Sequence, residues 1–448
     1  MTSASCKKYP KILLSIIASL GCLAIFLILS SSSLISSQTF GSAIRGYIYV
    51  VGRSQEADLI GTASDGTVVN FSHHSNILGS KGAGDDFQES DGGFGCDLYK
   101  GKWVYDSGGE PLYKHDSCPV LTQTQNCQGN GRPDKEYENW RWKPTQCGLP
   151  RFDARKFLDL MKGKTIAFIG DSVARNQMES LLCILWQVEV PNNRGNKRMQ
   201  RFVFASTSTT IIRIWSAWLV NKTSDQFDFA PAGVPELHID APDETIINLI
   251  TNFDIIVLSS GHWFAKQSVY ILQNEIVGGQ LWWPDKSKKM KIDNIKAFGI
   301  SVETILTAMV THPNYTGLTV VRTFSPDHYE GGKWNTGGSC TGKVRPLKDG
   351  QLFDNEFTKI MHQKQVRGFS RSIDKNTNKS KMKLMDITEA FAYRHDGHPG
   401  PYRSTDPNKI TKRGPDGRPP PQDCLHWCMP GPVDTWNEIL FEIIKREL

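Results

Sequence analysis

A short apolar run, a sharp turn and a segment with helical periodicity follow one another at residues 165–185, and this succession constrains the fold more than any other feature of the chain. Thr165 to Ile169 predicts a buried strand. The turn Gly170-Asp171-Ser172 comes next, and the apolar positions after it have the spacing of one helix face: Met178, Leu181, Leu182 and Leu185. We therefore expect Ser172 at the point where a strand passes into a helix.

A serine in that position has a chemical use. Backbone N–H groups at a helix start point toward whatever binds there, and the helix dipole favours negative charge. The Ser172 oxygen could attack a carbonyl carbon, and the resulting oxyanion would meet those donors. The alternative is that Asp171 or Ser172 only caps the helix.

A second segment, Asp423-Cys424-Leu425-His426-Trp427-Cys428-Met429-Pro430-Gly431, places an acid three residues before a histidine. A serine nucleophile needs a base, and the base needs a carboxylate that orients it. The alternative is a disulfide-tied loop with a surface histidine. Because one chain carries both halves of a triad, we predict that Ser172, Asp423 and His426 converge, although more than 250 positions separate Ser172 from Asp423.

A cysteine-rich and aromatic-rich stretch precedes these two segments. It contains Cys96-Asp97-Leu98, Gly131-Arg132-Pro133-Asp134, Trp140-Arg141-Trp142 and Cys147-Gly148-Leu149-Pro150-Arg151-Phe152. With these motifs in this order, the chain from about residue 95 to 447 resembles the trichome birefringence-like family of plant wall-polysaccharide O-acetyltransferases, and within it the members linked to xyloglucan and mannan acetylation. The resemblance implies an SGNH-hydrolase-like α/β fold with Ser172, Asp423 and His426 as catalytic residues.

Short β-branched runs alternate with helical stretches along the rest of the chain. The runs are 202–215, 253–258, 318–323 and 383–387, and the clearest helical stretches are 295–310 and 433–445. This alternation predicts a parallel sheet flanked by helices on both faces, with its binding site beyond the C-terminal strand ends.

Several residues near those strand ends are candidates for further roles. The Gly261 N–H is a candidate second oxyanion donor, the alternative being a plain turn glycine, and Asn176 could donate from its side chain or be an exposed helix residue, as could Arg175. His262 is an alternative base. Asp327-His328 is a further acid–histidine pair, for which we expect a role in acceptor binding.

One loop departs from the family pattern. Many relatives carry Gly-Cys-x-x-Cys where this chain has Gly278-Gly279-Gln280-Leu281-Trp282-Trp283. A disulfide cannot hold that loop here. We expect Trp282 and Trp283 to form a sugar-stacking surface that changes the choice of acceptor.

The N-terminus predicts a membrane anchor. Ile12 to Leu29 is an uncharged, mostly apolar run of eighteen residues, preceded by Lys7, Lys8 and Lys11. At a rise of about 1.5 Å per residue such a helix nearly crosses a bilayer core of ~30 Å. Basic residues before the run favour a cytoplasmic N-terminus, and the alternative, a cleaved signal peptide, usually has a core of only ~7–15 residues.

These features divide the chain into five predicted parts: a cytoplasmic tail (1–11), a transmembrane signal anchor (12–32), a flexible stem rich in Ser, Gly and Asp (33–94), the cysteine-rich module (95–152) and the catalytic domain (153–448). The module cannot build a core alone, so it is either part of a polysaccharide groove or a disulfide-tied flap on the main domain. The resemblance places the protein in the Golgi membrane as a single-pass protein with its catalytic domain in the lumen.

Eight of the ten cysteines follow the predicted anchor, and an even number in an oxidising lumen predicts disulfides. We expect the pairs Cys96–Cys147 and Cys118–Cys183. Cys340 should pair with Cys424 or Cys428, which leaves the partner of Cys127 open. Four Asn-x-Ser/Thr sequons, at Asn70, Asn221, Asn314 and Asn378, are expected to be accessible to glycosylation.

The predicted function is transfer of an acetyl group to hydroxyls of a wall glycan, xyloglucan or mannan. The partners are the polysaccharide acceptor, an acetyl donor (acetyl-CoA or a derived acetyl carrier) and the membrane, with no bound cofactor. A net charge of +6 is too mild to suggest nucleic acid, and without a Cys-x-x-Cys we expect no metal site. The competing functions are an acetylesterase on the same polymers and a binding protein with an unused triad.

Overall fold

The computed structural model describes residues 96–448 except 197–198, 225–232, 282, 284–288, 407, 409–419 and 421. The predicted tail, anchor and stem, and the sequon at Asn70, lie outside this range. None of the helices in the described range has the length and apolar character needed to cross a bilayer.

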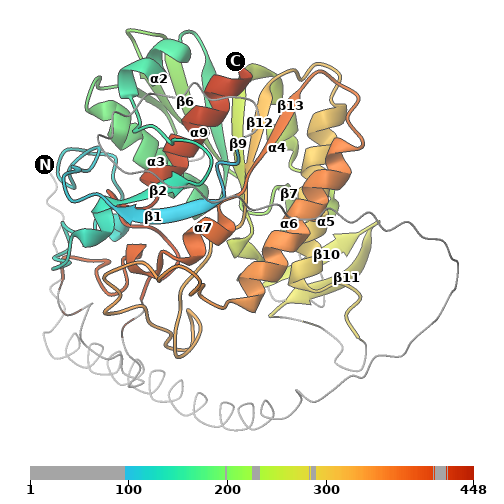
Figure 1. Ribbon diagram of the computed structural model, residues 1–448. Coiled ribbons are helices and arrows are strands. Elements are labelled where there is room, and N and C mark those ends of the chain that lie inside the picture. The colour runs from blue at the N-terminus through green and yellow to red at the C-terminus, as the bar shows by residue number, and fades with distance from the viewer. Residues whose placement is uncertain are drawn as a thin grey trace, which may run out of the picture. The chain divides into compact units, whose positions relative to one another are not determined.

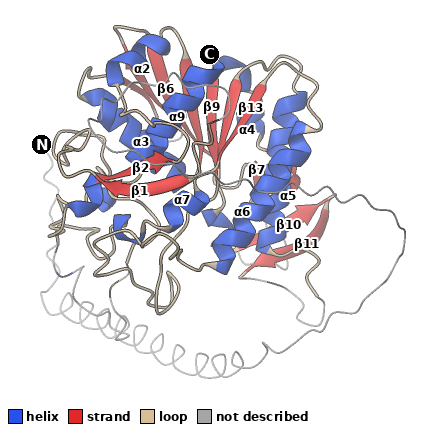
Figure 2. Cartoon of the chain, viewed as in Figure 1, coloured by secondary structure: helices blue, strands red, loops and turns tan. Residues whose placement is uncertain are grey.

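A seven-stranded sheet forms the centre, with the strand order β13-β12-β9-β3-β6-β5-β4 (Figures 1 and 2). Its strands are β3 (Thr165–Gly170), β4 (Asn192–Gly195), β5 (Met199–Phe204), β6 (Thr209–Trp215), β9 (Ile255–Ser259), β12 (Leu318–Arg322) and β13 (Lys381–Met385). The five strands from β13 to β6 are parallel, whereas β5 and β4 are antiparallel additions at one edge. The sheet is thus mixed, and the expected parallel part is its larger portion.

Side chains of β3 alternate between two hydrophobic cores, one on each face of the sheet. Ile166 and Phe168 join a core with α3 (Ser172–Trp186) and α9 (Asp434–Glu447). Ala167 and Ile169 join a second core with α5 (Asn294–Thr311) and α6 (Glu356–Ile373). Figure 1 shows α3 and α9 on one side of the sheet and α5 and α6 on the other. A strand buried on both faces explains the continuous apolar run at 165–169.

The remaining helices are short: α2 (Ala154–Leu160), α4 (Glu244–Ile247), α7 (Thr388–Ala392) and the 3-10 turns η1 (Gln123–Gln125), η2 (Glu136–Asn139), η3 (Ile250–Asn252), η4 (His262–Ala265) and η5 (His395–Gly397). A second sheet has the order β11-β10-β8-β7, built from β7 (Val220–Thr223), β8 (Glu236–Pro242), β10 (Ser268–Leu272) and β11 (Glu275–Gln280). The sequence patterns did not indicate this sheet.

The expected run 202–215 is two strands rather than one. β5 and β6 pair in antiparallel fashion, with Phe204 opposite Thr209. Between them the chain reverses, and Ser208 takes a positive φ of 56°. This turn contains neither glycine nor proline, so the sequence pattern predicted one continuous run.

The cysteine-rich region contributes buried aromatic side chains, including Trp103, Tyr113 and Trp142, to the main core. Its two strands, β1 (Gly101–Tyr105) and β2 (Trp140–Pro144), pair in antiparallel fashion. The buried Trp103 ring lies edge-on to Phe391 of α7, and its Nε1–H donates to the Ala390 carbonyl at 2.7 Å. The region therefore packs on the main domain, as a disulfide-tied flap would, and these aromatic rings serve as core.

Four disulfides join the eight cysteines in the described residues. Both expected pairs, Cys96–Cys147 and Cys118–Cys183, are present. Cys340 pairs with Cys424, and Cys127 pairs with Cys428, which lies 301 positions away in the sequence. Cys424 and Cys428, which form the last two bonds, flank His426 in the sequence.

The expectation that all four sequons are accessible to glycosylation is wrong for Asn378. Its Nδ2 donates to the carbonyl oxygens of Met309 (2.7 Å) and His312 (2.9 Å). An amide nitrogen that holds two backbone groups cannot carry a glycan in this fold.

Candidate active site

Ser172 is the first residue of α3 and follows β3 directly, as the sequence predicts. The turn between them requires Gly170, whose φ is 151° and whose added Cβ would lie 1.7 Å from the Ser259 carbonyl oxygen. Asp171 is the N-cap, and its Oδ1 accepts from the Val173 N–H at 2.9 Å. Because Asp171 caps the helix, the Ser172 hydroxyl is available for other contacts.

The Ser172 hydroxyl meets His426, and His426 meets Asp423. The Ser172 Oγ lies 2.8 Å from His426 Nε2. His426 Nδ1 lies 2.9 Å from Asp423 Oδ2 and 3.1 Å from Oδ1. With the proton on Nδ1, the ring donates to the carboxylate and Nε2 accepts from the serine, which is the tautomer that a general base requires.

The electrostatics of the pair favour this arrangement. Burial alone would raise the pKa of Asp423, but the charge and hydrogen bonds of His426 outweigh it and hold the carboxyl pKa below its ordinary value. Burial alone would lower the pKa of His426, but the Asp423 carboxylate raises it above its ordinary value. Asp423 is therefore a carboxylate that stabilises a protonated His426.

The backbone of the same loop holds Asp423 in place. Its Oδ1 accepts from the N–H groups of His426 (2.9 Å) and Leu425 (3.2 Å). The Arg403 Nε lies 3.9 Å from Oδ2. The carboxylate is only 5% exposed, whereas the His426 side chain is 17% exposed, so the base but not its orienting acid faces solvent.

Two backbone N–H groups, those of Ser172 and Gly261, are the candidate oxyanion donors. β3 and β9 are parallel neighbours, with Gly170 opposite Ser259, so the turns that follow them lie at the same sheet edge. Neither the Ser172 N–H nor the Gly261 N–H has an acceptor among the described residues. Gly261 has a φ of 137°, and a Cβ there would lie 2.7 Å from ring carbons of Phe324, so only glycine fits. Both N–H groups are thus free at this sheet edge in the described part of the chain, and their role as oxyanion donors stays a prediction.

Comparison with known families identifies two regions. Residues 149–443 match the GDSL/SGNH-like acyl-esterase family found in Pmr5 and Cas1p, and residues 94–148 match the PMR5 N-terminal domain. The chain belongs to this acyl-esterase family.

Curated relatives agree with the match. The chain is 72% identical to Arabidopsis thaliana protein trichome birefringence-like 18 over 354 residues, which is 79% of this chain and 66% of that relative. It is 68% identical to Arabidopsis thaliana protein YLS7 over 385 residues, 85% of this chain and 76% of the relative. It is 36% identical to Arabidopsis thaliana xyloglucan O-acetyltransferase 1 over 402 residues, 88% and 90% of the two chains. These relatives place this acyl-esterase family member among plant trichome birefringence-like proteins.

In this acyl-esterase family member Asn176 has a different role from the expected oxyanion donor. Its Oδ1 accepts from the Trp427 N–H at 2.7 Å, and its Nδ2 donates to the Trp427 carbonyl at 3.2 Å. The side chain is fully buried. Asn176 thus ties helix α3, which carries the serine, to the residue that follows His426.

His398 supports the same loop and was not indicated by the sequence. Its Nδ1 donates to the His426 carbonyl at 2.8 Å, and its ring stacks on Trp427 with centroids 4.2 Å apart. Burial lowers the pKa of His398 to about 3. Arg132 of the cysteine-rich region donates to the carbonyls of His398 (3.0 Å) and Asp396 (2.7 Å). No local sequence pattern around His398 or Arg132 indicated these contacts.

The other acid–histidine candidates do not form a second site of the expected kind. His328 is buried and bonded to His398 (2.7 Å) and the Ala392 carbonyl, so it cannot touch a polymer, and the expected acceptor-binding role is wrong for it. His262 is not the base, because its Nε2 lies against the Ser325 carbonyl at 3.0 Å. Arg175 pairs with Glu179 at 3.7 Å. Trp282 lies outside the described residues, and the sugar-stacking loop stays a prediction.

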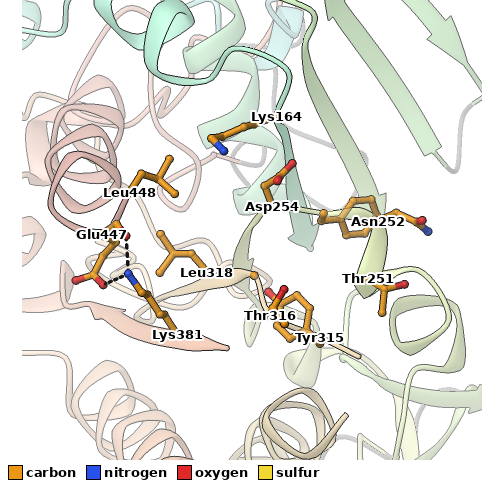
Figure 3. A pocket seen from close by; sticks show the side chains of 12 residues that line it. Lys164, Thr251, Asn252, Asp254, Tyr315, Thr316, Leu318, Lys381, Glu447 and Leu448 are labelled. Carbon is orange, nitrogen blue, oxygen red and sulfur yellow. Dashed lines mark hydrogen bonds and ion pairs between the residues drawn. The ribbon is translucent and has the colours of Figure 1, made fainter. Parts of the chain in front are cut away.

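A cavity in the described part of the chain lies away from Ser172, Asp423 and His426. No group of three or more His, Cys, Asp or Glu side chains within the described ranges could hold a metal ion. A cavity of about 370 Å³ lies at the opposite ends of the strands, lined by Lys164, Asp254, Leu318, Lys381 and Glu447 among others (Figure 3). Lys164 precedes β3 and Ser172 follows it, so the length of the strand separates this cavity from the serine.

Proposed function

We propose that this protein transfers acetyl groups to hydroxyls of a plant wall polysaccharide through an acyl-enzyme on Ser172. One observation carries the proposal, the continuous hydrogen-bonded chain from Ser172 through His426 to Asp423. The family membership supplies the acyl chemistry, and the xyloglucan O-acetyltransferases among the relatives suggest the acceptor.

In the first half-reaction the Ser172 oxygen attacks the acetyl carbonyl of the donor. The hydroxyl proton passes to His426 Nε2, and Asp423 stabilises the imidazolium that forms. The Ser172 and Gly261 N–H groups donate to the oxyanion. When this tetrahedral intermediate collapses, the proton on His426 goes to the leaving group and the acetyl group remains on Ser172.

The second half-reaction reverses these steps with a sugar hydroxyl as nucleophile. His426 takes its proton, the sugar oxygen bonds to the acetyl carbon, and the Ser172 oxygen leaves with the proton from His426. The side chain of His426 is partly exposed, so an acceptor hydroxyl can approach it from solvent. Hydrolysis needs the same groups with water in place of the sugar.

The acetylesterase alternative has one observation in its favour, the acyl-esterase description of the family. The acetyltransferases among the relatives favour transfer. We propose xyloglucan or mannan as the acceptor and acetyl-CoA or a derived acetyl carrier as the donor. We further propose a Golgi membrane protein, anchored through residues 12–32, with the triad in the lumen; protease protection in sealed vesicles tests this, since digestion of the catalytic part without detergent contradicts it.

The deciding experiment incubates the full chain with an acetyl donor and unacetylated xyloglucan, mannan and xylan fragments, and follows product mass. The proposal expects an increase of one acetyl group per transfer on xyloglucan or mannan, which is absent with Ser172→Ala. Release of acetate from acetylated glycans without any transfer would establish the esterase instead. Binding of glycan with neither reaction would leave only the binding protein.

A further inference from the structure

Three neighbouring strands, β12, β9 and β3, end at the same edge of the sheet, and His262 in the middle loop contacts both outer loops. Its Nδ1 lies 3.6 Å from Asp171 Oδ2 in the loop after β3. Its Nε2 lies 3.0 Å from the Ser325 carbonyl in the loop after β12. Its ring stacks on Phe324, with centroids 4.3 Å apart and planes 23° from parallel. The imidazole therefore contacts the loops after β3 and β12 from the loop between them.

The groups around the ring show what each of its nitrogen atoms contacts. A carbonyl oxygen only accepts, so Nε2 carries a proton for Ser325. The remaining atoms, Nδ1 of His262 and Oδ2 of Asp171, are both buried and have no hydrogen-bond partner in the described part of the chain. At 3.6 Å the two atoms interact electrostatically but are too far apart for a hydrogen bond. The imidazole and the carboxylate therefore face one another across a buried gap between two loops.

We propose that His262 is a positioning residue of the oxyanion hole, whose imidazole joins the loops after β3, β9 and β12. Asp171 directly precedes Ser172, and His262 directly follows Gly261. The pair therefore fixes the spacing between the two backbone N–H groups that would receive the oxyanion. This inference rests on the proposed function, because it assigns a role within the same acyl transfer.

Charged groups face the His262 ring from the loops after β3 and β12. Two carboxylates, Asp171 and Asp327, interact electrostatically with His262. Burial would raise the pKa of Asp171, but His262 and then the Val173 N–H hold it below its ordinary value. Arg322 of β12 also interacts with Asp171, and its guanidinium lies 4.1 Å from the Trp436 ring centroid.

The test measures acylation of Ser172 by the full chain, as the burst of p-nitrophenol released from p-nitrophenyl acetate. His262→Ala and Asp171→Asn are each expected to slow the burst 10- to 100-fold with little change in KM, by comparison with the ~10²- to 10³-fold cost of losing an oxyanion donor outright. Asn at position 171 keeps the helix cap but not the charge. The double variant should be no slower than the slower single variant, because the two residues act as a pair.

His262→Gln separates the Ser325 contact from the other contacts of the ring, and it also serves if His262→Ala fails to fold. Glutamine can donate to Ser325 but has no ring to stack on Phe324 and face Asp171, so its burst should remain slowed at an unchanged melting temperature. A wild-type burst rate in His262→Gln, or effects that multiply in the double variant, would overturn the role of His262. A wild-type protein without a burst, or a burst that survives Ser172→Ala, would instead refute the proposed function.

Discussion

Ser172 is held by regular secondary structure, whereas Asp423 and His426 lie on a loop that distant parts of the chain hold in place. The serine follows a strand buried on both faces and begins a fifteen-residue helix. The acid–base loop has neither helix nor named strand, and two disulfides flank it, Cys340–Cys424 and Cys127–Cys428. One half of the triad is thus positioned by local hydrogen bonding and the other by cross-links.

Because of this difference, changes near Ser172 and changes near His426 should affect activity and stability differently. A strand–turn–helix unit keeps its shape as long as the sheet is folded, so changes at Ser172 should affect chemistry alone. The loop depends on bonds from the cysteine-rich region, from the 340 loop and from helix α3. Loosening any of them should move His426 while the sheet stays intact, and a displacement of about 1 Å can cost ~10²-fold in rate.

The largest effect is expected at the nucleophile. Ser172→Ala should lower kcat by about 10⁶, as in other serine triads, with a melting temperature near that of the wild type. The matched control is Ser180→Ala on the same helix, which removes a buried hydroxyl bonded to Asp434 at 2.6 Å. That variant should lose stability and keep its rate. Acetyl transfer and thermal unfolding of both variants check this; normal transfer by Ser172→Ala would end the triad assignment.

Asp423→Asn tests the orienting acid. It should keep the fold but present the wrong tautomer of His426, with a loss of about 10⁴ in kcat. Combining it with Ser172→Ala should add little to the loss of the serine variant, because the residues act as a unit. Full activity in Asp423→Asn would mean that another group orients His426. Asp171 is not a ready substitute, since it caps α3 and faces His262.

Removal of the Cys127–Cys428 bond tests the cross-linked half directly. A Cys127→Ser, Cys428→Ser variant should lose about 2–5 kcal/mol of unfolding free energy and, below its melting temperature, at least ~10-fold in rate. The control removes Cys96 and Cys147, whose bond joins two positions within the N-terminal region. It should lose stability with a smaller effect on rate. Equal rate losses in the two variants would contradict the comparison.

A smaller effect is expected from Asn176→Ala, which removes both side-chain bonds to the Trp427 backbone. We expect a ~10-fold loss of rate and about 1–3 kcal/mol of stability. Asn437 is the matched control, because its buried amide joins α9 to α3 through the Gln177 carbonyl (3.2 Å) and Ser180 Oγ (2.9 Å), away from the loop. Asn437→Ala should cost similar stability and leave the rate unchanged. A rate loss in the control as large as in Asn176→Ala would refute the specific link.

The smallest of these effects is expected in the pH dependence of kcat/KM. His426 must be neutral to accept the serine proton, so activity falls as the pH drops through its pKa. Since Asp423 raises that pKa, the acid limb of kcat/KM should have its midpoint above the ordinary histidine value of about 6.5. Arg175 acts in the opposite direction, so Arg175→Gln should move the midpoint further up. A downward shift would contradict the charge assignment.

The sequence predicted the regularly structured half well, because its signals are local. The buried strand, the turn and the helix face at 165–185 all appear, 295–310 lies within α5, and 433–445 lies within α9 except for its first residue, which is the N-cap. The residue types at Asp423 and His426 also indicated their pairing, since their chemistry is carried by a three-residue spacing.

The sequence could not predict what holds the loop. The contact between Asn176 and Trp427 joins residues 251 positions apart, and no periodicity encodes it. The partner of Cys127 was open for the same reason, because spacing does not determine disulfide connectivity. The hairpin β10–β11 turns at Gln273 and Asn274, both with positive φ, without the glycine that usually marks such a turn.

The bond between Cys127 and Cys428 also has a consequence for how such chains are made and inherited. Cys127 is synthesised 301 residues before its partner, so it waits without that partner for most of the time that the chain is being produced. Arg132 likewise waits for the carbonyls of Asp396 and His398. A hybrid that joins the first 148 residues of one relative to the remainder of another would place a seam between these partners. Exchanges between relatives should therefore succeed only when both sides of the seam come as a matched set.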